Sequence, residues 1–423
     1  MFLTKAYMTF SHENLIKYER KTKMKSSIVK AITSGALALT MLICTAGCAG
    51  NSAQSGDSQQ SESSQSAEST ANAKVKIDGS KFTVDGKEFW INGANTPWDN
   101  WNDFGGNMDE EFWDKTFEQL VSDGINCTRI WINCNGEGVV RLKGTGEIKS
   151  INEEHWNDLD KLFALAEKHH IYLMPTLLSF DHCKGEDASA KKWRALIQSK
   201  ENCDAYAEQY VAEFSKRYGE NEYLFGIDIM NEPDWVYEND ECGKLPWDDL
   251  CYLFGKCAEV IHENCSTPVT VGFGIIKYNS AKYEGDKLAD DYLKELTGSD
   301  KAYIDFYSTH YYMWEKPYFG FPFNITPEKF GLDTDKPCLI GETSNDDEKQ
   351  AGMTLTEKYQ NAYENGWCGV MVWMQTEEDK SWYRYDLTEV ATNAMAKLIP
   401  EKIDPLNFHN YASDGAESTS KAA

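Results

Sequence analysis

The stretch LFGIDIMNEPDW, residues 224–235, is apolar for most of its length and then ends in an amide, a carboxylate and a proline. A near-continuous apolar run of this kind predicts a strand that is covered on both faces, as the strands of parallel sheets are. Proline lacks the N–H that a sheet requires, so Pro233 predicts the end of the strand. Asn231 and Glu232 are therefore expected at the carboxyl end of a buried strand.

Seven further apolar runs repeat this pattern, at 88–95, 126–132, 171–178, 268–273, 305–312, 337–342 and 369–374. Amphipathic segments that predict helices alternate with them, at 109–124, 152–170, 188–217, 247–264, 354–365 and 388–399. Eight strands alternating with helices predict an α/β fold, a single (β/α)8 TIM barrel. The rival is a doubly wound open sheet, which usually carries a glycine-rich phosphate loop after its first strand. Residues 92–106 contain no GxGxxG.

The two ends of such a barrel differ in sequence. Residues 84–89 predict a small hairpin with an Asp-Gly turn, which would close the bottom of the barrel before its first strand. Long segments follow strands 1, 2, 3, 4 and 6 and are expected to form the carboxyl-terminal rim. Active sites of TIM barrels lie on that rim.

Two glutamates end predicted strands on this rim, Glu232 after strand 4 and Glu342 after strand 7. A glycosidase needs such a pair, because one carboxylic acid protonates the leaving oxygen and one carboxylate attacks the anomeric carbon. A separation of roughly 5–5.5 Å between the two carboxyl groups would predict retention of configuration.

Residues 80–400 resemble glycoside hydrolase family 5, of clan A, through the ends of their strands. The matching motifs are NEP at 231–233, GE at 341–342, TRIW around Arg129, THYY with His310 and Tyr312, and MVWM around Trp373. The resemblance implies that Glu232 is the acid/base and Glu342 the nucleophile. It also implies that Asn231 donates to the sugar 2-hydroxyl, Arg129 holds the nucleophile and Trp373 floors the sugar site.

Elementary electrostatics agrees with these roles. Arg129 and the Tyr312 hydroxyl would favour the charged form of Glu342. Glu232 has no dedicated cation, so the neighbouring carboxylate is expected to raise its pKa and keep it protonated. The chemistry requires no cofactor and no metal, and the sequence contains no HExxH motif or other ligand cluster.

Further residues on the predicted rim are candidates for sugar contacts. The family often has a histidine after strand 3, where this chain has Asp181 and His182, and the sequence leaves open which of them enters the site. The other candidates are Trp98, Trp101, Trp131 and Trp235 for stacking, and Asn133 and Asn135 for hydrogen bonds. For each tryptophan, ordinary packing is an equally good interpretation.

The motifs look most similar to the bacterial β-mannanase branch of the family. We therefore expect an endo-β-1,4-mannanase that acts on mannan or galactomannan, with an endo-β-1,4-glucanase as the alternative. A hypothesis from another class is a surface lipoprotein that binds glycans without cleaving them. Such a protein has no need for two opposed glutamates beside an arginine and a tyrosine.

The two ends of the chain are expected to lie outside the barrel. Residues 1–48 predict an export leader, with a basic region, an apolar run and small residues before Cys48, the predicted lipidation site. An ordinary cleaved secretion signal is the alternative. Residues 49–73 are rich in Ser and Gln and predict a disordered linker, residues 74–410 the catalytic domain and residues 411–423 a disordered tail. The protein is expected to be exported from a bacterium, as a cell-surface lipoprotein or in secreted form.

Net charge limits the kinds of partner that the protein can bind, and cysteine spacing limits its disulfides. The net charge is −26, and it becomes −31 without residues 1–48, which carry seven basic and two acidic residues. So acidic a protein repels nucleic acid and favours a neutral substrate. We expect a monomer that touches a membrane only through a lipid. Cys242, Cys251, Cys257 and Cys265 lie close enough in sequence for one or two disulfides, whereas Cys127 and Cys338 are expected as buried thiols.

Overall fold

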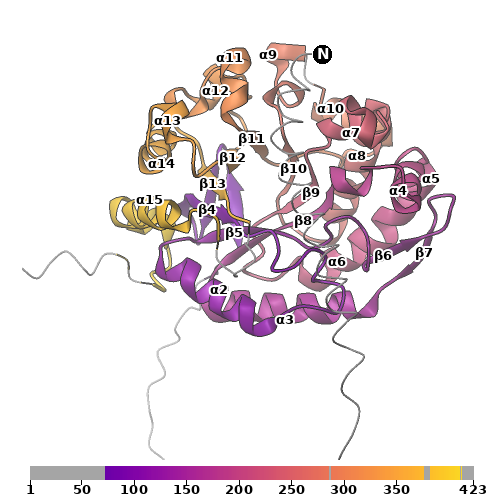
Figure 1. Cartoon of the computed structure of the whole chain (residues 1–423), viewed down its shortest axis with the longest axis horizontal. Coiled ribbons are helices and arrows are strands. Elements are labelled where there is room, and N and C mark those ends of the chain that lie inside the picture. Colours follow the sequence, from indigo (N-terminus) through magenta and orange to yellow (C-terminus); the bar gives the residue numbers. More distant parts are fainter. Residues whose placement is uncertain (1–71, 285–286, 376–381, 410, 412–423) are drawn as a thin grey trace, which may run out of the picture. The chain divides into compact units, whose positions relative to one another are not determined.

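The computed structural model describes residues 72–284, 287–375, 382–409 and 411. Eight parallel strands close into a barrel in the order in which they occur along the chain, and helices surround them (Figure 1). The strands are β4 (Ile91–Asn95), β5 (Cys127–Trp131), β8 (Tyr172–Ser179), β9 (Ile227–Asn231), β10 (Val269–Phe273), β11 (Tyr307–Tyr311), β12 (Cys338–Thr343) and β13 (Gly369–Trp373). The predicted barrel and all eight predicted strands are confirmed.

Burial explains why these strands could be predicted from the sequence. Every residue of the barrel strands is buried except Trp373, which is half-buried. A strand with both faces covered cannot alternate polar and apolar residues, so its sequence is one apolar run. The few polar side chains within the strands must therefore be paired with one another or with a ligand.

The longer helices are α2 (Glu110–Ser122), α3 (Glu153–His169), α4 (Ala188–Ile197), α5 (Lys200–Tyr206), α6 (Ala212–Tyr218), α8 (Trp247–Asn264), α10 (Asp290–Thr297), α14 (Leu355–Glu364) and α15 (Tyr385–Leu398). The shorter ones are α7 (Asp234–Glu238), α9 (Ala281–Glu284), α11 (Lys316–Phe319), α12 (Pro327–Phe330), α13 (Glu348–Ala351) and α16 (Pro400–Ile403). Helical structure was predicted across residues 188–217, and the chain forms there α4 and then α5 and α6, which a π-helical segment, Ala207–Val211, joins without a break. The first helix ends before Ser199, whose side chain accepts a hydrogen bond from the Asn202 N–H and caps the start of the next helix.

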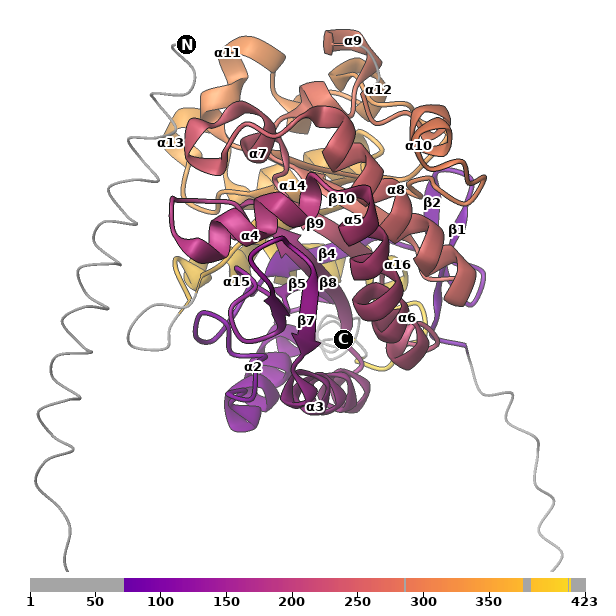
Figure 2. The ribbon, with the colours of Figure 1, turned by 90° about the vertical axis from the view of Figure 1, so that its right-hand side faces the viewer.

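A three-stranded antiparallel sheet closes the amino-terminal end of the barrel. It contains β1 (Val75–Asp78), β2 (Lys81–Val84) and β3 (Lys87–Phe89), and its strands β1 and β2 stand at the right-hand side of Figure 2. Asp85 and Gly86 both have positive φ, as a two-residue hairpin turn requires, so the predicted hairpin is confirmed. The Phe82 ring packs edge-on against Phe225 and Phe306 at centroid distances of 4.8 and 5.2 Å, directly before β9 and β11. A smaller hairpin, β6 (Val140–Leu142) and β7 (Ile148–Ile151), lies in the segment after β5.

All ten cysteines of the described residues are free thiols, so this part of the chain contains none of the disulfides considered for Cys242, Cys251, Cys257 and Cys265. Cys251 and Cys257 lie six positions apart on α8, which turns their side chains to different sides. Cys127 and Cys338 are buried thiols, as predicted. In the described ranges, no helix is long and apolar enough to cross a membrane. The predicted leader, Cys48, nearly all of the linker and residues 412–423 lie outside the described residues.

Candidate active site

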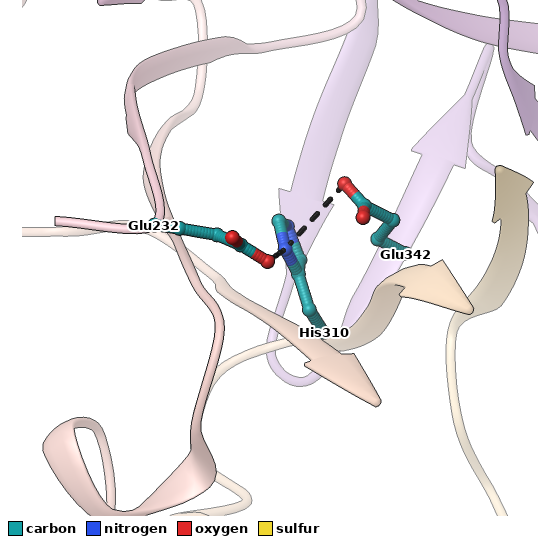
Figure 3. A group of neighbouring side chains, drawn as sticks. All are labelled: Glu232, His310 and Glu342. Carbon is teal, nitrogen blue, oxygen red and sulfur yellow. Dashed lines mark hydrogen bonds and ion pairs between the residues drawn. The ribbon is translucent and has the colours of Figure 1, made fainter. Parts of the chain in front are cut away.

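The carboxyl pair, Glu232 and Glu342, meets at the carboxyl-terminal end of the barrel. Glu232 directly follows β9, and Glu342 lies near the end of β12. Their side chains point toward one another with His310 of β11 between them (Figure 3). One ligand atom from each of these three residues lies within 4.8 Å of the other two, so the carboxylate oxygens approach that closely. The predicted meeting of two glutamates across the barrel is confirmed.

Glu342 contacts two strong hydrogen-bond donors. Arg129 Nη1 lies 3.3 Å from Glu342 Oε2, and the Tyr312 hydroxyl donates a hydrogen bond to Oε1. Arg129 is fully buried and is itself held by Asp228, whose Oδ2 accepts from Nη2 at 2.7 Å, and by Asn95, whose Oδ1 accepts from Nη1 at 2.9 Å. The guanidinium therefore has a single orientation, with one edge directed at Glu342.

Glu232 is surrounded by weaker donors. His310 Nδ1 lies 3.0 Å from Glu232 Oε1 and 3.5 Å from Glu342 Oε2, and the Trp235 side chain donates a hydrogen bond to the Glu232 carboxyl. The backbone of Glu232 has φ +47°, a left-handed conformation that costs free energy for a residue other than glycine. Its N–H donates to the Gly272 carbonyl at 2.6 Å, which holds the turn against β10. Such stored strain is typical of functional positions.

Asn231 completes this group. Its Oδ1 accepts a hydrogen bond from Arg129 Nη2 at 2.7 Å. Because the oxygen is occupied by the guanidinium, the Nδ2 amide group is the part of the side chain that can donate to a ligand. This orientation agrees with the predicted contact to a sugar hydroxyl.

Burial dominates the electrostatics of the carboxyl pair. It raises the pKa of Glu232 to about 7, with Arg129 opposing the rise and Asp181 adding to it. This shift was expected from the neighbouring carboxylate, but its largest cause is the loss of water. Burial also raises the pKa of Glu342, while the Arg129 guanidinium and the Tyr312 hydroxyl lower it.

The negative charge of the coupled pair belongs on Glu342. A guanidinium and a phenol donate to Glu342, whereas the donors to Glu232 are an indole and an imidazole. That imidazole is uncharged, because burial lowers the pKa of His310 to about 4. Hydrogen bonds from a cation favour the ionised form of a carboxyl group. Near neutral pH the pair therefore holds its proton on Glu232.

Four tryptophans pack together beside the site, with the Trp131 ring centroid 6.0 Å from the central carbon of the Arg129 guanidinium. Trp98, Trp131 and Trp373 form mutual edge contacts, with centroid distances of 5.2 Å for Trp98–Trp131 and 5.7 Å for Trp131–Trp373, and Trp101 packs against Trp98 at 4.8 Å. Trp98 and Trp131 are almost wholly buried, so they support the half-buried Trp373. Trp235 lies elsewhere: it stacks on Phe180 at 5.6 Å, on the side of Glu232.

The two candidates after β8, His182 and Asp181, have different surroundings. His182 is buried, with Nδ1 at the Ser179 backbone and its ring edge against Trp193, and burial lowers its pKa to about 3. Its Nε2 has no hydrogen-bond partner within the described residues. The charge of Asp181 contributes to the raised pKa of Glu232.

Two asparagines also lie after β5. Asn133 is buried with both amide atoms unpaired in the described part of the chain, so it retains its full hydrogen-bonding capacity for a ligand. The Asn135 side-chain oxygen accepts from the Asn102 amide at 2.7 Å.

Sequence reasoning missed the residues that hold Arg129. Asp228 and Asn95 are fully buried polar residues inside apolar runs, which is the signal that could have found them. It also found no ligand cluster, but folding brings together Glu232, His310 and Glu342 as a group that could hold a metal ion. Every contact in that group is also explained by the acid/base chemistry of a carboxyl pair, so the arrangement does not require a cation.

Comparison with known proteins gives consistent matches. No protein-family model matches the chain. The mannan endo-1,4-beta-mannosidase of Mytilus edulis is 25% identical over 340 residues, which cover 73% of this chain and 89% of that protein. The mannan endo-1,4-beta-mannosidase A of Podospora anserina is 25% identical over 179 residues, which cover 38% of this chain and 46% of that protein.

Solved structures of similar proteins share the fold. The β-mannanase of the blue mussel Mytilus edulis aligns with a TM-score of 0.67 and 20% identity, over 77% of this chain and 97% of that one. The β-1,4-mannanase of the sea hare Aplysia kurodai aligns with a TM-score of 0.68 and 22% identity, over the same shares. These relatives are animal and fungal proteins, so the resemblance to a bacterial branch stays a prediction. The chain has the (β/α)8 fold of these mannanases.

Proposed function

We propose that this protein is a retaining endo-β-1,4-mannanase of glycoside hydrolase family 5 that hydrolyses mannan or galactomannan. The observation that carries the proposal is the carboxyl pair itself, whose oxygens lie within 4.8 Å and whose Glu342 accepts hydrogen bonds from both Arg129 and Tyr312. This spacing suits a nucleophile and an acid on opposite sides of one glycosidic bond, with no room for the water that an inverting enzyme places between them. The mannan endo-1,4-beta-mannosidase of the mussel supports the choice of substrate.

The first step forms a covalent intermediate. A carboxylate oxygen of Glu342 attacks the anomeric carbon, and the bond from that carbon to the leaving oxygen breaks. The bonding electron pair goes to the leaving oxygen, which takes the proton of Glu232. Asn231 Nδ2 is placed to donate to the sugar 2-hydroxyl. The products are a glycosyl ester on Glu342 and the shortened polysaccharide.

The second step reverses the role of Glu232. The ester has no charge, so the Glu232 carboxylate now takes a proton from water. The water oxygen attacks the anomeric carbon, the ester bond breaks, and Glu342 regains its negative charge. The proton remains on Glu232, and both residues return to their starting forms.

Three measurements test this function. Reducing ends should appear from galactomannan much faster than from carboxymethylcellulose, and a short-lived product should have the β-configuration by NMR. A 2-deoxy-2-fluoro-mannosyl donor should leave one sugar on Glu342, located by mass spectrometry. Cleavage of the cellulose derivative alone would favour the endo-glucanase alternative, and binding of mannan without cleavage would favour a glycan-binding lipoprotein.

For the leader we propose lipidation of Cys48 and export to the cell surface. The small residues at 45–47 directly before Cys48 support this, as does the Ser- and Gln-rich linker that follows. Full-length protein expressed in a bacterium should fractionate with membranes, and the Cys48→Ser variant should not. Equal fractionation of the two proteins would point to an ordinary secretion signal.

A further inference from the structure

Two buried carboxyl groups lie behind the carboxyl pair, and the chemistry above does not use them. These rear carboxyls are Asp234, the first residue of α7, and Glu315, at the end of the short 3-10 turn Met313–Glu315. Asp234 is 1% exposed and Glu315 is 0% exposed. Neither forms an ion pair with a lysine, arginine or histidine in the described part of the chain. Buried carboxyl groups are costly, so their retention calls for an explanation.

Each rear carboxyl accepts a backbone N–H from a turn beside the carboxyl pair. Asp234 Oδ1 accepts from the Gly274 N–H at 2.9 Å, which joins the turn after β9 to the end of β10. Glu315 Oε1 accepts from the Tyr312 N–H at 2.9 Å, which closes the turn after β11. Tyr312 is the residue whose hydroxyl contacts Glu342.

Asp234 is also close to Glu232 itself. A Cβ placed on Gly274 would lie 3.1 Å from Asp234 Oδ2 and 3.1 Å from Glu232 Oε1, so both side chains press against the same glycine. The Asp234–Gly274 bond and the Glu232–Gly272 bond together hold the strained backbone of Glu232 against β10. Without the first bond, the left-handed turn would be free to relax.

We propose that the two rear carboxyls are positioning residues, and that each fixes the turn serving one member of the carboxyl pair. Asp234 places Glu232, and Glu315 places Tyr312 against Glu342. Both act as neutral acids through their acceptor oxygens, because the buried cation nearby, Arg129, already contacts Asp228 and Glu342. This inference rests on the proposed function as a retaining glycosidase.

Burial supports the neutral state. It raises the pKa of Asp234 well above its ordinary value, and the charge of Glu232 adds to the rise. Burial likewise raises the pKa of Glu315, with Asp234 and Glu232 adding to it. The charged and titratable groups around Glu232 are Arg129 and Asp228 on β5 and β9, Asp181 after β8, Asp234 on α7, His310 and Tyr312 at β11, Glu315 after it and Glu342 on β12.

Leaving-group dependence distinguishes the two roles. A 2,4-dinitrophenolate leaves without protonation, so the first turnover of 2,4-dinitrophenyl β-mannobioside needs Glu342 but not the acid Glu232. We expect Asp234→Ala to lower kcat on mannohexaose by about 100-fold while leaving the dinitrophenol burst within about threefold of wild type. We expect Glu315→Ala to lower kcat on mannohexaose and the rate of the dinitrophenol burst by similar factors of about 100, because the nucleophile acts on both substrates.

The amide variants are the matched controls. Asp234→Asn and Glu315→Gln keep an acceptor oxygen and remove the acid, so both should retain most of the wild-type kcat and the wild-type pH profile. An amide variant as slow as its alanine counterpart, or a shifted pH profile, would show that charge rather than placement matters and would overturn the proposal. So would equal losses of Asp234→Ala on the two substrates.

A loss of activity must be distinguished from a failure to fold. Thermal unfolding is measured for every variant, and Gly274→Ala replaces Asp234→Ala if the latter does not fold. The added methyl should press on Glu232 and Asp234 and give the same selective loss on mannohexaose; equal losses on both substrates would contradict the proposal. If wild type cleaves neither substrate, the proposed function fails; if it cleaves both and the variants show no selectivity, only this inference fails.

Discussion

The two ends of the barrel are built on the same eight strands but carry opposite kinds of side chain. At the amino-terminal end, Phe82 of the small sheet packs on Phe225 and Phe306 in a wholly apolar contact. At the carboxyl-terminal end, the buried side chains include Arg129, Glu232 and Glu342. Burial stabilises the first set and costs free energy for the second.

This difference separates stability from activity within one fold. The strands between the two ends are covered on both faces, so the apolar end can offset the free energy that the polar end costs. Substitutions at the apolar end should then lower the free energy of unfolding and spare catalysis, and substitutions at the polar end should lower catalysis without lowering the free energy of unfolding.

The largest effect is expected from Glu342→Gln. Loss of the nucleophile should lower kcat on mannan on the order of 10⁵-fold, because no other group replaces the covalent step. Binding of manno-oligosaccharides, measured by calorimetry, should persist, since the amide fills the same space. Residual activity within tenfold of wild type would refute the role of Glu342.

At the opposite end, Phe82→Ala should destabilise the protein by about 3–5 kcal/mol, because it leaves a cavity beneath β9 and β11. Denaturant unfolding measures this loss, and kcat/KM per folded molecule should stay unchanged. Lys81→Ala is the matched control, since its ion pair with Glu88 is solvent-exposed and worth less than about 1 kcal/mol. A loss of kcat/KM in Phe82→Ala would show that the two ends are coupled.

Glu232→Gln should raise the free energy of unfolding at pH 7. The pKa of Glu232 is about 7 in the folded protein and lower when unfolded, so the folded state binds more protons between pH 4.5 and 7. Stability from this group is therefore present at low pH and is lost as the pH rises toward 7. Relative to wild type, the variant should gain about 3 kcal/mol at pH 7 and little near pH 4. A gain in stability that does not depend on pH would mean that the pKa of the Glu232 carboxyl group is not raised in the folded protein.

The smallest effect is a pH limb in wild type. The acid must hold its proton, so kcat/KM should fall tenfold per pH unit above about 7, the pKa of Glu232. The same profile measured for the burst with 2,4-dinitrophenyl β-mannobioside should lack this alkaline limb. A limb shared by both substrates would assign it to another group.

Much of this site could be predicted from the sequence, because strands that are buried on both faces appear in it as continuous apolar runs. The run at 224–232 is apolar and ends in Asn231 and Glu232, and the run at 337–342 ends in Glu342. In a parallel barrel all strand ends meet on one rim, so the topology alone brings these residues together. The break before Ser199 was not foreseen, because a local cap competes with a helical pattern that otherwise continues.

Other features depend on contacts between distant segments, which a linear pattern does not contain. In the sequence, Asp234 and Glu315 are ordinary acidic residues next to tryptophans, and only folding buries them behind the carboxyl pair. The pKa of Glu232 likewise follows from the loss of water and from Arg129 and Asp181, on two other strand ends. The barrel and the two glutamates could be read from the sequence alone, since both follow from burial along a strand. Tertiary contacts set the main cause of the raised pKa of Glu232, which is the loss of water, because burial depends on which distant segments cover the residue.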